Sequence, residues 1–307
     1  MKTVVADYRS IIYAVRIEAR GGEVARFVQY PHDLSMTSGS GNFEYNAGSG
    51  YDFTSFTTTA GTTPGVVDLR GVLLNAVGYL GRDEVASRVW DGARAYMFAT
   101  TWASPVEDEE PMGQFLLGKA RIEDDKYVFE LMQLIDAANQ MTGRTVGPLC
   151  TWTLFDRTLD GDFLPWHRSR CTGPRSNPDG PNINDFLVTG TITSLASQTL
   201  LRDENRFEQA DWFGAGSIRF TSGANAGLLS EEIKRHYNDG AGNNGVIELY
   251  LPFHYPVQVG DQYEMIPGCR KRREEDCIGN YGNGINHGAF DRVPVSSVYQ
   301  SIGTGAA

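Results

Sequence analysis

The sequence predicts a mainly β fold of the α+β class, made of two duplicated β-rich units with short helices and a C-terminal segment that contains cysteines. Three observations support this prediction: a high glycine content, segments in which apolar and polar residues alternate, and an order of elements that occurs twice. Glycine accounts for 35 of the 307 residues, whereas its usual share is roughly 7%. Because glycine is frequent in turns, the surplus indicates many short elements joined by turns.

The first half of the chain reads as a series of strands with one helix. Alternation over 12–20 predicts a half-buried strand, with residues 23–29 as its hairpin partner. Residues 35–64 are rich in Ser, Thr and Gly with aromatic residues at intervals, which predicts a long loop or an irregular hairpin. A helix is expected over 83–90, where the spacing is helical and the first turn is acidic. Further strands are expected at 66–69, 94–102, 114–122 and 127–134.

The second half repeats this order, with a strand at 217–220, a helix at 228–236 and strands at 245–253 and 262–266. Individual residues correspond too, such as Asn75 with Asn225 and Pro105 with Pro256. We interpret this as a duplication relating residues 65–122 to 216–268. The alternative is a chance coincidence of turns and amphipathic strands. The predicted domains are a first β-domain at 1–149, a cysteine-containing inter-repeat segment at 150–185, a second β-domain at 186–268 and a cysteine-containing C-terminal segment at 269–307.

The charge balance bears on possible partners. Lys and Arg number 27 against 38 Asp and Glu, for a net charge of −11. Tight binding to nucleic acid depends on basic residues that neutralise phosphates, so we expect DNA to pass this surface without specific binding; ordinary solubility is the alternative explanation. The sequence contains no apolar run of about 18 residues, so no membrane span is expected. The N-terminus lacks the apolar region of a signal peptide, which predicts synthesis and assembly in the cytoplasm.

Four cysteines are the candidate binding residues: Cys150, Cys171, Cys269 and Cys277. One pair follows each repeat, so convergence would create a site with four thiolates, suited to tetrahedral zinc or to an iron–sulfur cluster. The basic run 270–273 is expected to lower the pKa of the neighbouring thiol. The glycines at 279–288 allow backbone N–H groups to point at sulfur. Buried free cysteines and disulfides are the alternatives.

The sequence supports an enzymatic role less well than it supports a metal site. His167 precedes Cys171 by four residues and His287 follows Cys277 by ten, so a Cys/His nucleophile pair is conceivable. No third orienting group accompanies either pair, and no signature of a hydrolase, metalloprotease or nucleotide-binding loop occurs. We therefore expect no catalytic residues and no enzymatic activity.

Three stretches carry a family resemblance: 216–227, 255–261 and 267–286. The last runs from Pro-Gly-Cys-Arg-Lys-Arg to Tyr-Gly-Asn-Gly-Ile-Asn. Together they resemble the tail-tip hub family (phage tail baseplate hub) of lambda-like siphophages and gene transfer agents. The sequence departs from the family pattern at Arg270 and in the longer spacing of both cysteine pairs.

The resemblance implies a structural hub of a long-tailed phage, located in the virion at the tail tip and active during genome ejection. The two units would be tail-tube-like β-barrels. A homotrimer would join the sixfold tube to the threefold tip, between a distal tail protein ring and a central fibre or tip protein, around a DNA channel. Cys150, Cys171, Cys269 and Cys277 would hold an iron–sulfur cluster, of the 4Fe-4S type, with zinc as the alternative. The alternative functions are a tail-associated cysteine-dependent cell-wall hydrolase and a four-cysteine metal-binding module.

Overall fold

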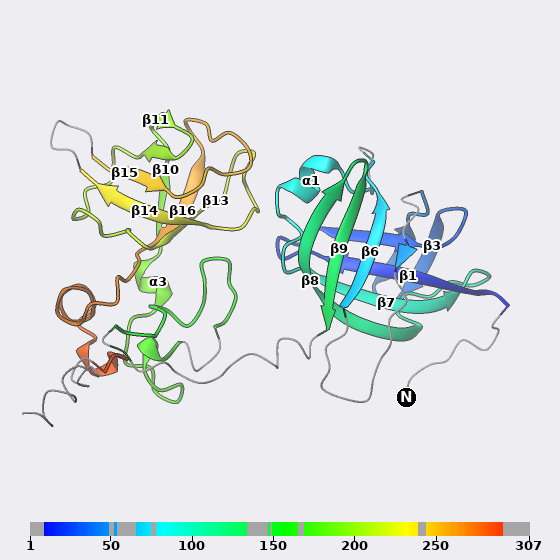
Figure 1. Ribbon diagram of the computed structural model, residues 1–307, viewed down its shortest axis with the longest axis horizontal. Coiled ribbons are helices and arrows are strands. Elements are labelled where there is room, and N and C mark those ends of the chain that lie inside the picture. The colour runs from blue at the N-terminus through cyan, green and yellow to red at the C-terminus, as the bar shows by residue number, and fades with distance from the viewer. Residues whose placement is uncertain are drawn as a thin grey trace, which may run out of the picture. The chain divides into compact units, whose positions relative to one another are not determined.

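The computed structural model describes residues 9–48, 52–53, 66–74, 78–133, 147, 149–164, 169–238 and 244–290. The chain forms two compact units, Met1–Met141 and Thr142–Ala307, and each contains one seven-stranded antiparallel sheet (Figure 1). The predicted mainly β class is therefore confirmed. The finer division of the chain into four segments stays a prediction.

In the first unit the strands lie side by side in the order β2-β1-β7-β8-β9-β6-β5. Figure 1 shows that the sheet is curled, so that β6, β8 and β9 cross β1 and β7. The hairpin β3–β4 forms a separate two-stranded sheet. The strands of this unit are β1 Ile11–Glu18, β2 Val24–Val28, β3 Leu34–Ser38, β4 Gly41–Tyr45, β5 Asp52–Phe53, β6 Val66–Val72, β7 Arg94–Thr101, β8 Glu110–Glu123 and β9 Lys126–Gln133.

Strand β1 is buried on both faces. Successive side chains of a strand point to opposite faces, so Val15 and Ile17 lie together in the main core of the unit. Ile12 and Ala14 point the other way and pack in a second cluster with residues of β3 and β4. The hairpin within 35–64 thus covers the back of the sheet; residues 54–64 lie outside the described part of the chain.

The helix expected at 83–90 is present but shorter. Helix α1 spans Arg82–Ala86. It ends at Ser87, and Arg88 follows with a φ of 65°, in the left-handed region that commonly stops a helix. Val85, on the helix, and Trp90, in the turn after it, are both buried in the core of the first unit. Their shared burial produces the spacing that predicted a longer helix.

The second unit has strand order β10-β16-β13-β14-β15-β12-β11. Its core contains Ile218 and Phe220 from β13, Ile247 from β15 and Met265 from β16. Strands between 188 and 202 were not expected from the sequence. The elements are η1 Arg170–Thr172, α3 Ile183–Phe186, β10 Val188–Thr191, β11 Ser194–Ser197, β12 Leu200–Arg202, β13 Ser217–Phe220, β14 Glu231–Tyr237, β15 Val246–Leu249, β16 Gln262–Ile266, the π-helix η2 Arg273–Asn280 and η3 Gly284–Asn286.

The prediction of a helix at 228–236 is wrong, because most of this stretch lies in strand β14. A bulge shifts its pairing with β15 between Ile233 and Arg235. The extra residue of a bulge breaks the two-residue period of a strand, so Ile233 and His236 both face inward although they are three residues apart. That three-residue spacing imitates a helix in the sequence.

The residue-by-residue correspondence between 65–122 and 216–268 is not seen in the strand pairing. β7 and β8 are neighbours, whereas the strands expected to match them, β15 and β16, are not. Asn75 lies outside the described residues. Asn225 is buried and binds the backbone of Tyr255 through both amide atoms, at 2.8 and 3.0 Å. The two units therefore each contain a seven-stranded sheet. The predicted correspondence between the strands of 65–122 and those of 216–268 is not found.

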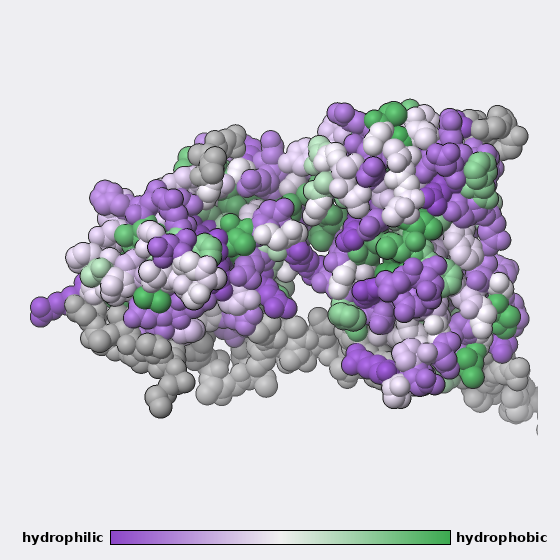
Figure 2. Space-filling view, turned by 180° about the vertical axis from the view of Figure 1, so that it is seen from behind, coloured by the Kyte–Doolittle hydropathy of each residue, from purple (hydrophilic) through white to green (hydrophobic). Residues whose placement is uncertain are grey.

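Each unit has a predominantly hydrophilic surface on the face drawn in Figure 2, where apolar side chains gather in small areas. Within the described part of the chain, no helix is long and apolar enough to cross a membrane.

Candidate functional site

The structure brings the four cysteines together within the second unit. Cys150 lies in a loop, Cys171 on η1, Cys269 just after β16 and Cys277 on η2. All four are free thiols; Cys269 is half-buried and the others are buried. We call this group the four-cysteine site. Three segments that are distant in the sequence, around 150, 171 and 269–277, therefore meet at one place.

An apolar cluster separate from the core of the sheet surrounds this site. Trp152, Leu154 and Phe155 pack in it together with Ile183 and Ile266. Gly288 lies so close to Trp152 that a Cβ atom added to it would stand 2.0 Å from the indole nitrogen. Any residue with a side chain at position 288 would collide with the indole ring of Trp152, so glycine is required there. The cluster ties the loop after Cys150 to the chain that follows Cys277.

The charges of the four thiols act on one another. Burial, followed by the thiolate charges of Cys277, Cys269 and Cys150, raises the pKa of Cys171 to about 12. Burial and the charges of Cys269 and Cys150 raise the pKa of Cys277 to about 11. Burial also raises the pKa of Cys269, to which Cys150 contributes as well. Every pair among the four is thus electrostatically coupled.

The basic run 270–273 acts on the pKa of Cys269 in the expected direction, but it does not set the net shift. Lys271 does lower the pKa of Cys269, but burial outweighs it. The arginines of the run are engaged elsewhere: Arg270 pairs with Asp211, and the guanidinium of Arg272 donates to both oxygens of Asp276, at 3.0 and 3.1 Å. These two arginines therefore pair with carboxylates and not with the thiols.

Each sulfur atom has one N–H group or ring nitrogen within hydrogen-bond distance. Backbone N–H groups donate to Cys269, from Lys271 at 3.4 Å, and to Cys150, from Gly288 at 3.3 Å. The glycine-rich segment thus provides a backbone donor to sulfur, as its composition predicted.

Side chains serve the other two sulfur atoms. Asn283 Nδ2 lies 3.2 Å from Cys171 Sγ, and His287 Nδ1 lies 3.3 Å from Cys277 Sγ. Asn283 was not singled out from the sequence. The Gly/Asn-rich run around it was the available signal, but the run has no spacing that identifies one residue.

Geometry at the four-cysteine site differs from that of a site for one metal ion. Among the described residues, no group of three or more His, Cys, Asp and Glu side chains is placed to hold a metal ion. Four thiolates around one zinc ion, each at about 2.3 Å, would lie within about 4 Å of one another. The donor set itself, four thiols each with an N–H group or a ring nitrogen near the sulfur, is of the chemical kind that binds zinc or an iron–sulfur cluster.

The contact between Cys277 and His287 resembles a nucleophile with its base, but the environment opposes that role. A reactive cysteine has a lowered pKa and is partly exposed. Cys277 is 4% exposed, and burial raises its pKa to about 11. The thiol is therefore neutral and shielded near neutral pH. His167 lies outside the described residues.

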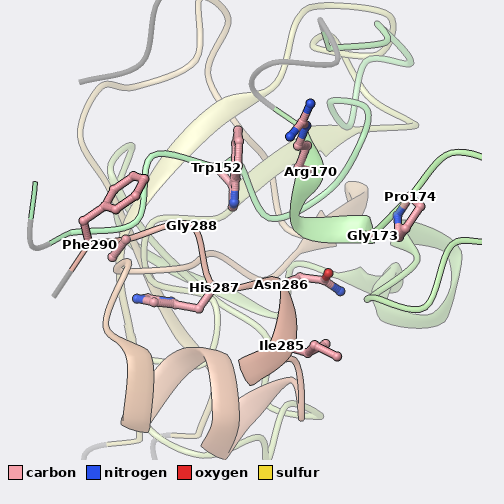
Figure 3. A pocket seen from close by; sticks show the side chains of 10 residues that line it. Trp152, Arg170, Gly173, Pro174, Ile285, Asn286, His287, Gly288 and Phe290 are labelled. Carbon is pink, nitrogen blue, oxygen red and sulfur yellow. The ribbon is translucent and has the colours of Figure 1, made fainter. Parts of the chain in front are cut away.

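A hollow of about 520 Å³ opens beside the four-cysteine site (Figure 3). Trp152 and Arg170 stand on one side of it, with the guanidinium carbon 5.7 Å from the centre of the indole ring. Ile285, Asn286 and His287 stand on the opposite side. His287 thus lies between this hollow and the sulfur of Cys277.

Comparison with known proteins identifies the family. Residues 6–158 match the family model described as "Baseplate hub protein, N-terminal attachment domain", and residues 211–297 match "Phage conserved hypothetical protein BR0599". A chain in the solved structure "Virion of native gene transfer agent (GTA) particle" has a similar fold, with a TM-score of 0.73 and 21% identity over 94% of this chain and 90% of that chain. No curated protein matches the chain. Through the match of residues 6–158, the chain belongs to the phage baseplate hub family, which supports a structural role in a phage tail.

Proposed function

We propose that the protein is the structural hub at the tip of a long-tailed phage tail, where a homotrimer joins the sixfold tail tube to the threefold central tip. The match of residues 6–158 to a baseplate hub attachment domain is the observation that carries this proposal. The partners are a distal tail protein ring above and a central fibre or tip protein below, and the site of action is the virion, after assembly in the host cytoplasm.

The number of units per chain supports the trimer. Each chain contains two units built on a seven-stranded antiparallel sheet. Three chains therefore supply six such units, which is the number that a sixfold tube presents. The strand orders of the two units differ. The six units of a trimer would therefore be alike in architecture, but they would not be equivalent residue by residue.

The charge of the chain supports a DNA channel. With a net charge of −11, three copies repel a polyanion and lack the basic excess that binding to phosphates requires. DNA would therefore pass during ejection without adhering to the wall.

We further propose that the four-cysteine site holds an iron–sulfur cluster of the 4Fe-4S type. Four thiols with no other cysteine nearby, together with N–H groups directed at sulfur, are the ligand set that such a cluster uses. The preference for the cluster over zinc rests on the family resemblance. When bound, the cluster supplies covalent bonds between iron and sulfur that join the three segments.

Anaerobic purification tests the cluster. We expect a brown protein with broad visible absorption and close to stoichiometric iron and sulfide, all lost when any of the four cysteines is replaced by serine. Colourless protein that contains zinc would favour the four-cysteine metal-binding module instead. The alternative of a cell-wall hydrolase has only the contact between Cys277 and His287 in its favour; peptidoglycan cleavage that is lost in Cys277→Ala would establish it.

Assembly is tested separately by light scattering on the purified chain and by reconstruction of the particle. A ring of three copies around a channel lined by acidic side chains is expected. A single copy per particle, or a channel lined by Lys and Arg, would contradict the proposed hub.

A further inference from the structure

Asn283 bonds to two of the cysteines at once. Its side chain donates from Nδ2 to the carbonyl oxygen of Cys171 at 2.7 Å and lies 3.2 Å from the sulfur of the same residue. Its backbone N–H donates to the carbonyl oxygen of Cys277 at 2.7 Å. Cys171 and Cys277 belong to segments more than a hundred residues apart in the sequence, and this one residue connects them directly.

The orientation of the Asn283 amide is set by its surroundings. Asn286 donates from Nδ2 to the oxygen of the Asn283 side chain at 2.8 Å, so the NH₂ group of Asn283 must face Cys171. An amide NH₂ group has two donors, and Cys171 offers two acceptors, its carbonyl oxygen and its sulfur. Asn283 is only 3% exposed, so water does not replace these bonds readily.

The other donors to sulfur are different in kind. Those from Lys271 and Gly288 are backbone groups, which every residue type except proline supplies. His287 is only partly buried and contacts a sulfur but neither backbone of the pair. Asn283 is therefore the donor to sulfur whose side chain is required and whose bonds also hold two segments together.

We infer that Asn283 is the positioning residue of the four-cysteine site, which holds Cys171 against the segment of Cys277 and directs an N–H group at the Cys171 sulfur. The inference rests on the proposed cluster site for one part only. The structural role of Asn283 applies whether or not a cluster is bound. In the metal-free chain Asn283 keeps the segment 169–180 in place. In the loaded chain its N–H group stabilises negative charge on the Cys171 sulfur.

Hydrogen exchange on the full-length, reduced and chelator-treated chain tests the inference. Asn283→Asp keeps the size of the side chain and the acceptor for Asn286, but it removes the donor and places an oxygen against the Cys171 carbonyl. A buried acceptor that loses its partner is costly, so we expect the amides of Gly173 and Gly180, which are hydrogen-bonded within the segment, to exchange about tenfold faster. Strands β13 and β16 should exchange as in the unchanged chain.

Asn280→Asp is the matched control, since it makes the same change of charge three residues earlier. The oxygen of Asn280 accepts a hydrogen bond from Gln209 at 3.0 Å, and aspartate preserves that bond. Unchanged exchange at Gly173 and Gly180 in Asn283→Asp would overturn the inference. Equally fast exchange in Asn280→Asp, or in β13 and β16 as well, would do the same, because the effect would then not be local to Asn283.

Iron and sulfide content separates this inference from the proposed cluster. If the unchanged chain binds no iron but Asn283→Asp still loosens the segment 169–180, the cluster is wrong and the positioning role stands. If the unchanged chain binds iron and Asn283→Asp alters neither exchange nor the reduction potential of the cluster, the positioning role is wrong and the cluster stands.

Discussion

Tyr263 donates a hydrogen bond of 2.7 Å from its hydroxyl to Oδ2 of Asp203, and both residues are at most 1% exposed. The same carboxylate lies 3.3 Å from the backbone nitrogen of Thr191 and 3.5 Å from the guanidinium of Arg206. Asp203 follows β12, Thr191 ends β10 and Tyr263 lies on β16. One buried carboxylate thus connects the edge strand β10 and its neighbour β16 with the chain that follows β12, near the other edge of the second sheet.

Tyr263→Phe removes one partner from this carboxylate and leaves the packing of the ring unchanged. Loss of a hydrogen bond to a buried charged group costs about 1–3 kcal/mol, so the free energy of unfolding of the second unit should fall by that amount. Urea denaturation followed by fluorescence measures it. Tyr250→Phe is the control, because Tyr250 is 59% exposed; equal losses in both variants would show that the buried bond has no special weight.

His236 makes the second unit sensitive to acid. Burial lowers the pKa of this side chain from its usual 6.5, although Glu208 and Asp211 act in the opposite direction. Below pH 6.5 the unfolded chain binds a proton that the folded chain does not bind, so stability is full above pH 6.5 and falls as the pH drops towards the lowered value. Unfolding measured between pH 7.5 and 5.5 should show this loss.

His236→Phe should flatten that pH dependence. The ring of His236 packs edge-on against Phe213, with ring centres 5.0 Å apart, and phenylalanine can keep such a contact without a group that titrates. His254→Phe, at an exposed position, is the control. A pH profile in His236→Phe that matches the unchanged protein would assign the acid sensitivity to other groups.

Gly288→Ala should disturb the four-cysteine site without a change at any cysteine. The added Cβ would stand 2.0 Å from the Trp152 indole nitrogen, and overpacking of this kind costs about 1–3 kcal/mol. The N–H group that donates to the Cys150 sulfur would also move. The midpoint temperature of thermal unfolding and the iron content should both fall. Gly147 has open space around it, so Gly147→Ala should alter neither quantity. Full iron content in Gly288→Ala would show that the site tolerates the shift.

Removal of the proposed cluster should loosen one part of the second unit before the rest. Structural metal sites contribute folding free energy of order 10 kcal/mol, comparable to the net stability of a whole domain. Hydrogen exchange after chelation should therefore rise first in 150–172 and 269–290, while the strands of both sheets stay protected. Simultaneous loss of protection in β13–β16 would mean that the sheet depends on the site as well.

Local sequence patterns were sufficient for many elements of the fold. Alternation identified β1 and its hairpin partner β2, and the strands β7 to β9 and β16 follow the expected ranges closely, because period-two burial leaves a direct trace in the order of residues. The same pattern failed at β14, where a bulge between Ile233 and Arg235 alters the period. A bulge depends on the partner strand and has no local signature here.

The sequence by itself determined the class of fold, the acidic charge, the family resemblance and the four thiols as the candidate ligands. Only the tertiary structure decided that burial outweighs the basic run in setting the pKa of Cys269, that Asn283 links Cys171 with Cys277, and that the units differ in strand order. The physical reason is that charge and alternation belong to single segments of chain. Burial, pairing and hydrogen bonds between residues a hundred positions apart exist only after the chain has folded.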